Sequence, residues 1–196
     1  MRSRRITFVF AIIALAVGFL MQYEYPSAAP RGGAALLVSS TTATSSLGVS
    51  PVLRVIDGDT IVVLFEGVTT TVRLLGVDTP ETVDPHKSMQ CFGPEASAEV
   101  KQLLDGTSVQ LEADPSQGHL DWYGRTLAYV YLPDGTLLDE FLIAQGYGRE
   151  YTYHSAYKYQ ARFKAAQENA KREQRGLWSP TTCDGGTTRV ASTTMQ

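Results

Sequence analysis

Two acidic segments in the middle of the chain carry residue types that bind a hard cation. Asp59 lies in Asp57-Gly58-Asp59-Thr60, and Asp78 and Glu81 lie in Asp78-Thr79-Pro80-Glu81. Pro80 keeps Thr79 extended, so the second segment bends with fixed geometry. Carboxylates together with a backbone carbonyl are the oxygen ligands that Ca²⁺ prefers. We expect the carboxylates to converge on one ion if both segments end neighbouring strands, although Asp-Gly alone is also a plain turn signal.

Two arginines could serve a phosphate next to these acids. Arg73 interrupts the apolar run 72–75, which is costly unless its guanidinium reaches a partner. That partner is either a carboxylate or a phosphate, which the guanidinium fork fits. Arg125 follows Trp122 and Tyr123, so one base could stack there while the cation holds a phosphate; a β-turn with surface aromatics is the alternative. Acids, arginines and a spare carboxylate as base together fit phosphodiester hydrolysis.

The elements around these residues predict a small barrel. Three β-rich runs at 52–56, 60–65 and 69–77 are joined by Gly-containing turns and predict an antiparallel meander. A helix is expected from Gly93 to Gly106, strands at 108–112 and 126–132, and helices at 137–144 and about 155–175. This order is typical of an α+β, mainly β fold, a five-stranded Greek-key barrel of OB type with three helices.

The two ends of the chain differ from its middle in composition. Three arginines precede an apolar run at 6–21, which indicates a signal peptide or an uncleaved signal anchor over 1–26. A buried helix is the remaining alternative. In either export case the rest of the chain lies outside the cytoplasm. We expect a flexible Ser/Thr/Ala/Gly linker over 27–50, a folded domain over 51–180 and a disordered tail over 181–196.

Charge and composition restrict the class of protein. Hydrophobic residues make up 43% of the 196 residues, so wholesale disorder is excluded. The segment 51–180 holds 12 Lys and Arg against 18 Asp and Glu, a net charge of −6. An acidic domain does not capture nucleic acid by charge alone, so a polyanionic substrate needs a few placed cations or a metal ion.

The only two cysteines are Cys91 and Cys183. In an oxidising compartment a lone pair forms a disulfide by default. Two free thiols or a shared metal site are the alternatives, and the metal site is poor because two cysteines alone fall short of the usual four zinc ligands.

A series of motifs along the chain matches one known family in order and spacing. These motifs are 55–60, 73–82, 92–97, 123–125 with 127–129, 145–146 and 176–178. On them the chain resembles the staphylococcal nuclease (thermonuclease) family over about residues 52–179. The resemblance implies an OB-fold barrel and a Ca²⁺-dependent nuclease that acts on DNA and RNA and leaves 3′-phosphates. We expect a monomer without a protein partner.

The resemblance also implies roles for individual residues. Asp59 and Asp78 match the calcium carboxylates, and Thr79 matches a residue whose carbonyl ligates the ion. Arg73 and Arg125 match the phosphate-contacting arginines, and Glu81 matches the carboxylate assigned, with dispute, as general base. Tyr123 matches a tyrosine near the phosphate, and Tyr151 or Tyr153 one that flanks the base. The pair Cys91 and Cys183 resembles that of exported relatives.

Two departures from the family pattern and two alternative functions accompany these expectations. The type member is basic, whereas this domain is acidic, and Trp122 stands where the type member has a lysine. We therefore expect weaker non-specific binding and more stacking. The main alternative is a non-catalytic OB-fold module that binds nucleic acid, but such modules usually lack the acids and arginines present here. A surface-anchored adhesive domain is the other.

Overall fold

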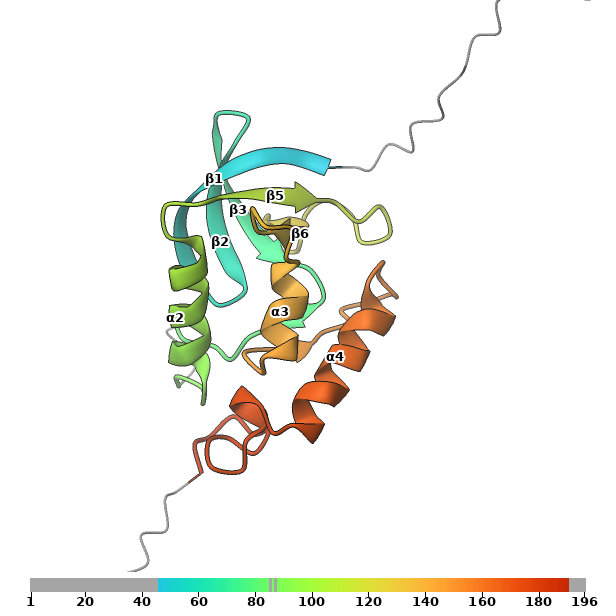
Figure 1. The fold of residues 1–196 in the computed structure, drawn as a ribbon. Helices are drawn as coiled ribbons and strands as arrows, with labels where there is room; N and C mark the ends of the chain where they lie inside the picture. Colours follow the sequence, from blue (N-terminus) through green and yellow to red (C-terminus); the bar gives the residue numbers. More distant parts are fainter. Residues whose placement is uncertain (1–45, 85, 87, 191–196) are drawn as a thin grey trace, which may run out of the picture. The chain divides into compact units, whose positions relative to one another are not determined.

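Five strands close into a barrel in the order β1-β2-β3-β6-β5 (Figure 1). The computed structural model describes residues 46–84, 86 and 88–190, and the expected signal or anchor at 1–26 lies outside them. Neighbouring strands are antiparallel except β3 and β6, which are parallel. The barrel strands are β1 (Ser46–Asp57), β2 (Thr60–Phe65), β3 (Val68–Leu74), β5 (Ser108–Glu112) and β6 (Thr126–Tyr131).

Three α-helices and a short ladder complete the domain. Figure 1 shows α3 beside α4, below the barrel strands in that view. The α+β class, the five-stranded barrel and the three helices predicted from the sequence are confirmed. These elements are α2 (Gly93–Leu104), α3 (Leu138–Ala144), α4 (Gln160–Arg172), the 3₁₀ helix η1 (Gly176–Trp178), and the two-stranded ladder of β4 (Val77–Asp78) with β7 (Arg149–Glu150). Among the described residues, no helix has the length and apolar character to cross a membrane.

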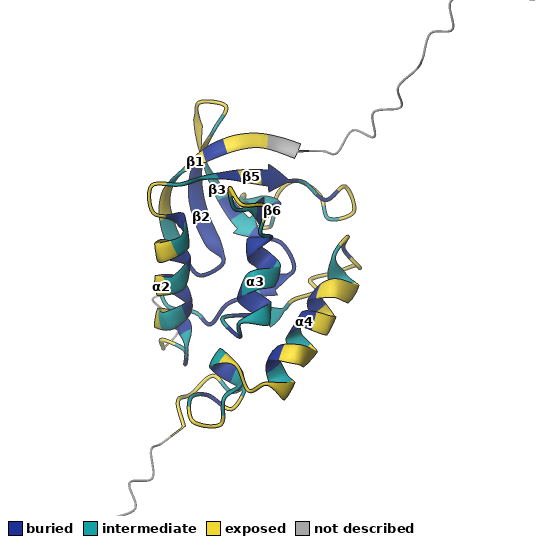
Figure 2. Cartoon of the chain, viewed as in Figure 1, coloured by how far each residue is buried: buried dark blue, intermediate teal, exposed yellow. Residues whose placement is uncertain are grey.

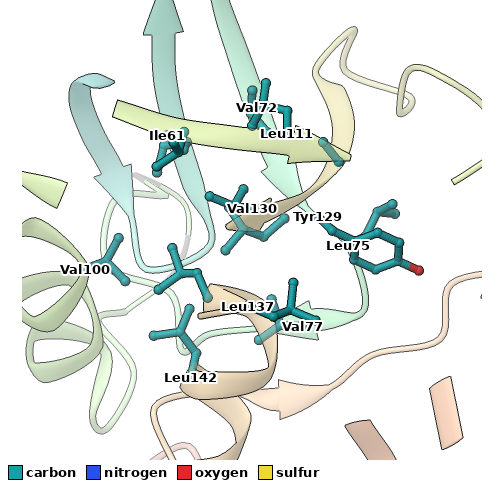
Figure 3. Packing of buried hydrophobic residues seen from close by; sticks show 14 of the residues in the cluster. Ile61, Val72, Leu75, Val77, Val100, Leu111, Tyr129, Val130, Leu137 and Leu142 are labelled. Carbon is teal, nitrogen blue, oxygen red and sulfur yellow. The ribbon is translucent and has the colours of Figure 1, made fainter. Parts of the chain in front are cut away.

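The core fills the barrel and extends to the helices α2, α3 and α4. Alternate residues of the strands point inward, and α2 and α3 add Val100 and Leu142, so that one apolar cluster links the sheet to the helices (Figure 3). Phe163 of α4 packs edge-on against Tyr129 with ring centroids 6.2 Å apart. The outward face of α4 is exposed, as Figure 2 shows. This core provides the rigid base on which the strand ends lie.

The run expected as one strand over 69–77 is broken in the structure. β3 ends at Leu74, and Gly76 takes a φ of +73° before β4 begins at Val77. A Cβ at Gly76 would lie 2.6 Å from the ring of Tyr157, so only glycine fits this close approach. The break turns Asp78 away from the barrel ladder and into the pair with β7.

The last helix is shorter than expected. It begins at Gln160 rather than near 155, because the preceding residues make contacts that a helix would not allow. The Tyr157 hydroxyl donates to the Gly76 carbonyl at 3.3 Å, and the backbone N–H of Lys158 donates to Asp114 at 2.8 Å. These bonds attach the segment before α4 to the barrel.

Both expected flexible ends overlap ordered structure. Strand β1 begins at Ser46, inside the expected linker, because residues 46–51 pair with β5 and close the barrel. Part of the expected disordered tail, up to residue 190, is also described. The Cys91 N–H donates to the Thr187 carbonyl at 2.8 Å, which fixes this segment against the start of α2.

The disulfide predicted between Cys91 and Cys183 is present. The two residues are 92 positions apart, and they pack with Leu177 in a small cluster separate from the main core. In the chain-entropy model a loop of this size contributes about 4 kcal/mol of stability.

We therefore expect a reducing agent to lower the melting temperature by roughly 10 °C or more. Differential scanning calorimetry with and without a dithiol would measure this. The Cys91→Ser/Cys183→Ser variant should melt at the lower temperature under both conditions. A wild-type melting temperature that does not respond to the dithiol, with free-thiol titration proving reduction, would contradict the expectation.

Candidate active site

Arg73 contacts both Asp59 and Asp78, the two carboxylates that we call the acidic cluster. Its Nη2 lies 3.1 Å from Asp59 Oδ2 and 3.3 Å from Asp78 Oδ1. Its Nη1 donates to the carbonyls of Leu74 and Val77 at 2.6 and 2.7 Å. The turn after β1 supplies Asp59, and β4 supplies Asp78. Because one guanidinium nitrogen touches both carboxylates, the two acids share one small region at the strand ends.

Thr79 lies directly against Asp59. Its backbone N–H donates to Asp59 Oδ2 at 3.0 Å, and the Thr60 hydroxyl donates to Asp59 Oδ1 at 2.9 Å. A Cβ at Gly58 would lie 2.7 Å from Thr79 Oγ1, so the Asp-Gly turn allows this close packing. The acidic turn and the Asp78-Thr79 segment are thus in direct contact.

Asp57 supports the same turn from the other side. Its Oδ1 accepts hydrogen bonds from the Gly58 N–H at 2.9 Å and from the Thr82 hydroxyl at 2.7 Å. Burial, as the largest effect, raises the pKa of the Asp57 carboxyl, and the negative charge of Asp59 also raises it. Asp57 therefore joins the turn to the segment after Asp78.

The donor set around Asp59 fits a hard cation. The Asp59 side chain is 10% exposed, whereas that of Asp78 is 50% exposed and reaches solvent. Thr79 Oγ1 is buried without a hydrogen-bond partner among the described residues. No cluster of three or more His, Cys, Asp or Glu in the described ranges is arranged for a metal. A Ca²⁺ ion held by Asp59 and Asp78 would therefore take its other ligands from uncharged oxygens and water.

The electrostatics of Asp78 agree with this fit. Burial, followed by repulsion from Asp59, raises the pKa of the Asp78 carboxyl, while the cations of Arg73 and Arg149 lower it. A divalent ion between the two carboxylates would relieve their repulsion.

Arg125 reaches the same region from the loop before β6. Its Nε donates to Asp121 Oδ2 at 2.6 Å, and its Nη1 donates to the Thr60 hydroxyl at 3.3 Å. Since that hydroxyl donates in turn to Asp59, a chain of three contacts leads from Arg125 through Thr60 and Asp59 to Arg73. Both arginines therefore lie beside the acidic cluster.

Asp121 fixes the conformation of the loop that carries Arg125. Besides pairing with the guanidinium, its carboxylate accepts the backbone N–H groups of Tyr123 and Arg125, both at 2.9 Å. Burial raises the pKa of the Asp121 carboxyl, but the bonds from Arg125 outweigh it and leave the pKa below its usual range. Sequence reasoning did not select Asp121, although a carboxylate four residues before Arg125 is close enough in the chain to suggest an ion pair with it.

Glu81 is committed to the backbone that follows it. Its Oε1 accepts the N–H groups of Thr82, Val83 and Asp84 at 3.0, 2.8 and 3.0 Å. Burial raises the pKa of the Glu81 carboxyl, but these N–H donors together leave the pKa below its ordinary value. Such a carboxylate is ionised at neutral pH, yet it is a weaker base than a free glutamate.

The predicted aromatic residues lie in two exposed places. Trp122 and Tyr123 are 90% and 80% exposed, and the Arg125 guanidinium stacks over the Tyr123 ring at 5.2 Å. Tyr151 and Tyr153 pack on each other with centroids 6.1 Å apart. The Tyr151 N–H donates to the Gly76 carbonyl at 2.9 Å, which attaches this second pair close to β4.

Arg149 is a charged neighbour of the cluster that sequence reasoning missed. In the antiparallel ladder of β4 and β7, its backbone lies directly opposite that of Asp78. Each strand of this ladder has only two residues, so no alternation of polar and apolar residues could mark it in the sequence.

A closed five-stranded barrel with acids and arginines gathered at its strand ends suits a hydrolase that cleaves phosphodiesters. Residues 71–180 match the family model described as staphylococcal nuclease homologue. The chain is 44% identical over 128 residues to a thermonuclease of Staphylococcus hyicus, covering 65% of this chain and 74% of that one. The chain belongs to the staphylococcal nuclease family and is a nuclease.

Other relatives agree with this assignment. A thermonuclease of Staphylococcus intermedius is 42% identical over 127 residues, which cover 65% of this chain and 74% of that one. Endonuclease YncB of Bacillus subtilis is 42% identical over 127 residues, which cover 64% of this chain but 59% of the relative. The similarity to the Bacillus protein therefore leaves much of that longer chain unmatched.

Proposed function

We propose that the chain is a Ca²⁺-dependent nuclease that hydrolyses DNA and RNA, leaves 3′-phosphates and acts outside the cytoplasm. The observation that carries the proposal is the contact of Asp59 and Asp78 with one nitrogen of Arg73, because it gathers two metal-type carboxylates and a phosphate-type cation in one place. The disulfide supports an oxidising compartment.

In this proposal Asp59, Asp78 and the Thr79 carbonyl would hold the metal ion, which would supply neutralising charge for the phosphate oxygens. Arg125 extends toward the same phosphate and stabilises the charge that grows on it during attack by water. Arg73 orients the two aspartates, and its positive charge beside them favours a bound phosphate. Glu81, ionised at neutral pH, orients the attacking water rather than removing its proton outright.

The test is a nuclease assay on the full-length chain with single-stranded DNA, duplex DNA and RNA. Activity should appear with Ca²⁺, vanish with a chelator and return on adding Ca²⁺. The 3′ ends of labelled products should be ligated to a 5′-phosphorylated oligonucleotide only after a phosphatase has removed the 3′-phosphate. Equal cleavage in chelator and in Ca²⁺ would refute the metal dependence, and N-terminal sequencing of native protein would test export.

A stacking role for Trp122 gives a separate prediction. Base stacking on an aromatic side chain contributes about 1–3 kcal/mol per base, and Trp122 is almost fully exposed next to the Tyr123–Arg125 pair. We expect Trp122→Ala to raise KM for single-stranded DNA about tenfold while kcat changes little.

Trp122→Lys is the informative control, since it exchanges stacking for charge. It should recover binding at low salt and lose it again as the salt concentration rises. Steady-state kinetics at two salt concentrations would measure both effects. An unchanged KM in Trp122→Ala would exclude a contact between this side chain and substrate.

A further inference from the structure

Arg149 lies opposite a proposed metal ligand. In the antiparallel pair of β4 and β7, Asp78 and Arg149 are direct partners. Directly opposed residues in such a pair place their side chains on the same face with Cβ atoms about 5 Å apart. This guanidinium is thus close enough to compete with a cation for the Asp78 carboxylate.

The C-terminal loop, residues 179–190, binds the Arg149 guanidinium through backbone carbonyls, so that within the described ranges the guanidinium does not pair with Asp78. Its Nη2 donates to the carbonyls of Gly185 and Gly186 at 2.9 and 3.1 Å, and the guanidinium stacks over Trp178 at 5.6 Å. In the part of the chain that the structure describes, no ion pair joins Arg149 to Asp78. The loop therefore takes the donors that would otherwise turn toward the carboxylate.

The disulfide ties this loop to the body of the domain. Cys183 lies two residues before Gly185 and is bonded to Cys91 next to α2. The Gly185 N–H donates to the Leu177 carbonyl at 2.8 Å, and the Gly186 N–H donates to the Cys183 carbonyl at 2.7 Å. The carbonyls that hold Arg149 are therefore positioned by a covalent bond between Cys183, close to them in the chain, and Cys91, 92 positions earlier.

We propose that Arg149 is a competitor of the metal ion for the Asp78 carboxylate, and that the disulfide-tied C-terminal loop restrains its guanidinium so that Asp78 stays available to Ca²⁺. The inference rests on the proposed metal dependence. It implies that reduction of the disulfide by a dithiol, which yields two cysteine thiols and an oxidised dithiol, frees Arg149 to pair with Asp78 and weakens Ca²⁺ binding.

The first experiment leaves the disulfide intact. Calorimetric titration of the full-length chain with CaCl₂, without nucleic acid, compares wild type, Arg149→Lys and Arg149→Gln. Lysine keeps the charge but cannot reproduce the planar fork on two carbonyls, so we expect Ca²⁺ binding about three- to tenfold weaker. Glutamine removes the cation, so affinity should equal or exceed that of wild type.

Lys171→Gln is the matched control. The Lys171 ammonium also stacks on Trp178, at 5.0 Å, but its partner is Glu168 rather than Asp78. Its removal should leave Ca²⁺ affinity unchanged. The proposal is overturned if Arg149→Lys binds like wild type, or if Arg149→Gln binds more weakly than wild type, which would indicate a purely structural role.

The second experiment removes the disulfide. Cys91→Ser/Cys183→Ser should bind Ca²⁺ about tenfold more weakly, and adding Arg149→Gln should restore the affinity. Circular dichroism at the titration temperature checks folding. If this variant unfolds, the comparison of Arg149→Lys and Arg149→Gln with wild type still tests the proposal. Weakening that Arg149→Gln does not restore would overturn the proposal. A wild-type chain that binds no Ca²⁺ would instead refute the proposed metal dependence itself.

Discussion

Arg125→Ala is expected to lower kcat by about 10²–10³-fold, the cost of removing one donor to developing charge. The guanidinium is held by Asp121 and by the Thr60 hydroxyl, so it is already oriented toward Asp59 before substrate arrives. KM should change less than kcat, because the interaction strengthens only in the transition state. Steady-state kinetics at saturating Ca²⁺ would measure this effect.

Two further variants make this result specific. Arg125→Lys keeps the charge but loses the fork, so it should recover only part of the rate. Arg162→Ala removes an arginine of α4 that forms a surface ion pair with Glu140 of α3. The kcat of this variant should stay within about twofold of wild type. An Arg125→Ala variant with unchanged kcat and raised KM would place Arg125 in ground-state binding alone. Arg73 suits this test poorly, because its loss also removes four structural contacts.

Asp139→Asn is expected to make the domain more stable at neutral and alkaline pH. The Asp139 side chain on α3 is 0% exposed, its Oδ2 accepts the Val130 N–H at 2.9 Å, and its Oδ1 is buried without a hydrogen-bond partner among the described residues. Burial raises the pKa of Asp139 from 3.8 to about 8, against the lowering effect of the Val130 N–H and the Arg73 cation. The carboxyl is therefore neutral in the folded protein at pH 7.

The direction of the pH dependence follows from linkage. The unfolded chain loses this proton near pH 3.8 and the folded chain only near pH 8. Stability is complete below the lower value, falls as the pH rises between the two, and falls no further above the upper one. Asparagine stays neutral throughout, so the gain in unfolding free energy should grow across this window to roughly 2–4 kcal/mol at pH 8.

Urea denaturation at pH 5, 6.5 and 8 would measure this gain. Asp134→Asn is the control, because Asp134 lies in an exposed turn, where its carboxylate accepts the Thr136 N–H, and should show no comparable change with pH. A gain that is equal at all three pH values would mean that Asp139 does not titrate in the expected window. A loss at pH 8 would mean that the ionised carboxylate stabilises the fold.

Much of the barrel and of the acidic cluster could be predicted because strong local signals mark them. Asp57-Gly58 and the Pro80 segment define turns from residue type alone, and the strands before them carry β-branched runs. An arginine inside an apolar run has few acceptable partners, so Arg73 predicted that a carboxylate or a phosphate lies next to it, without deciding between them. These features depend on neighbours in the chain, which a sequence displays directly.

Other features depend on contacts between distant segments. Arg149 lies opposite Asp78 only because the chain turns back after α3. The Glu81 carboxylate accepts backbone N–H groups, and no residue type in the sequence reveals the direction of those groups. Similarly, Glu112 accepts hydrogen bonds from the hydroxyls of Tyr131 and Tyr159, which joins the barrel to the segment before α4. No spacing in the sequence indicates such a network, because its members come from three separate elements.

The pairing of β1 with β5 determines where a working fragment can start. Of the five residues of β1 that are matched with β5, four precede residue 51. A protein beginning at residue 51 would leave most of the β5 edge open, with free backbone groups that invite association with other chains. A soluble, monomeric preparation therefore has to retain the residues from 46 onward, and proteolysis just after Ser50 would convert a sealed barrel into an aggregation-prone sheet.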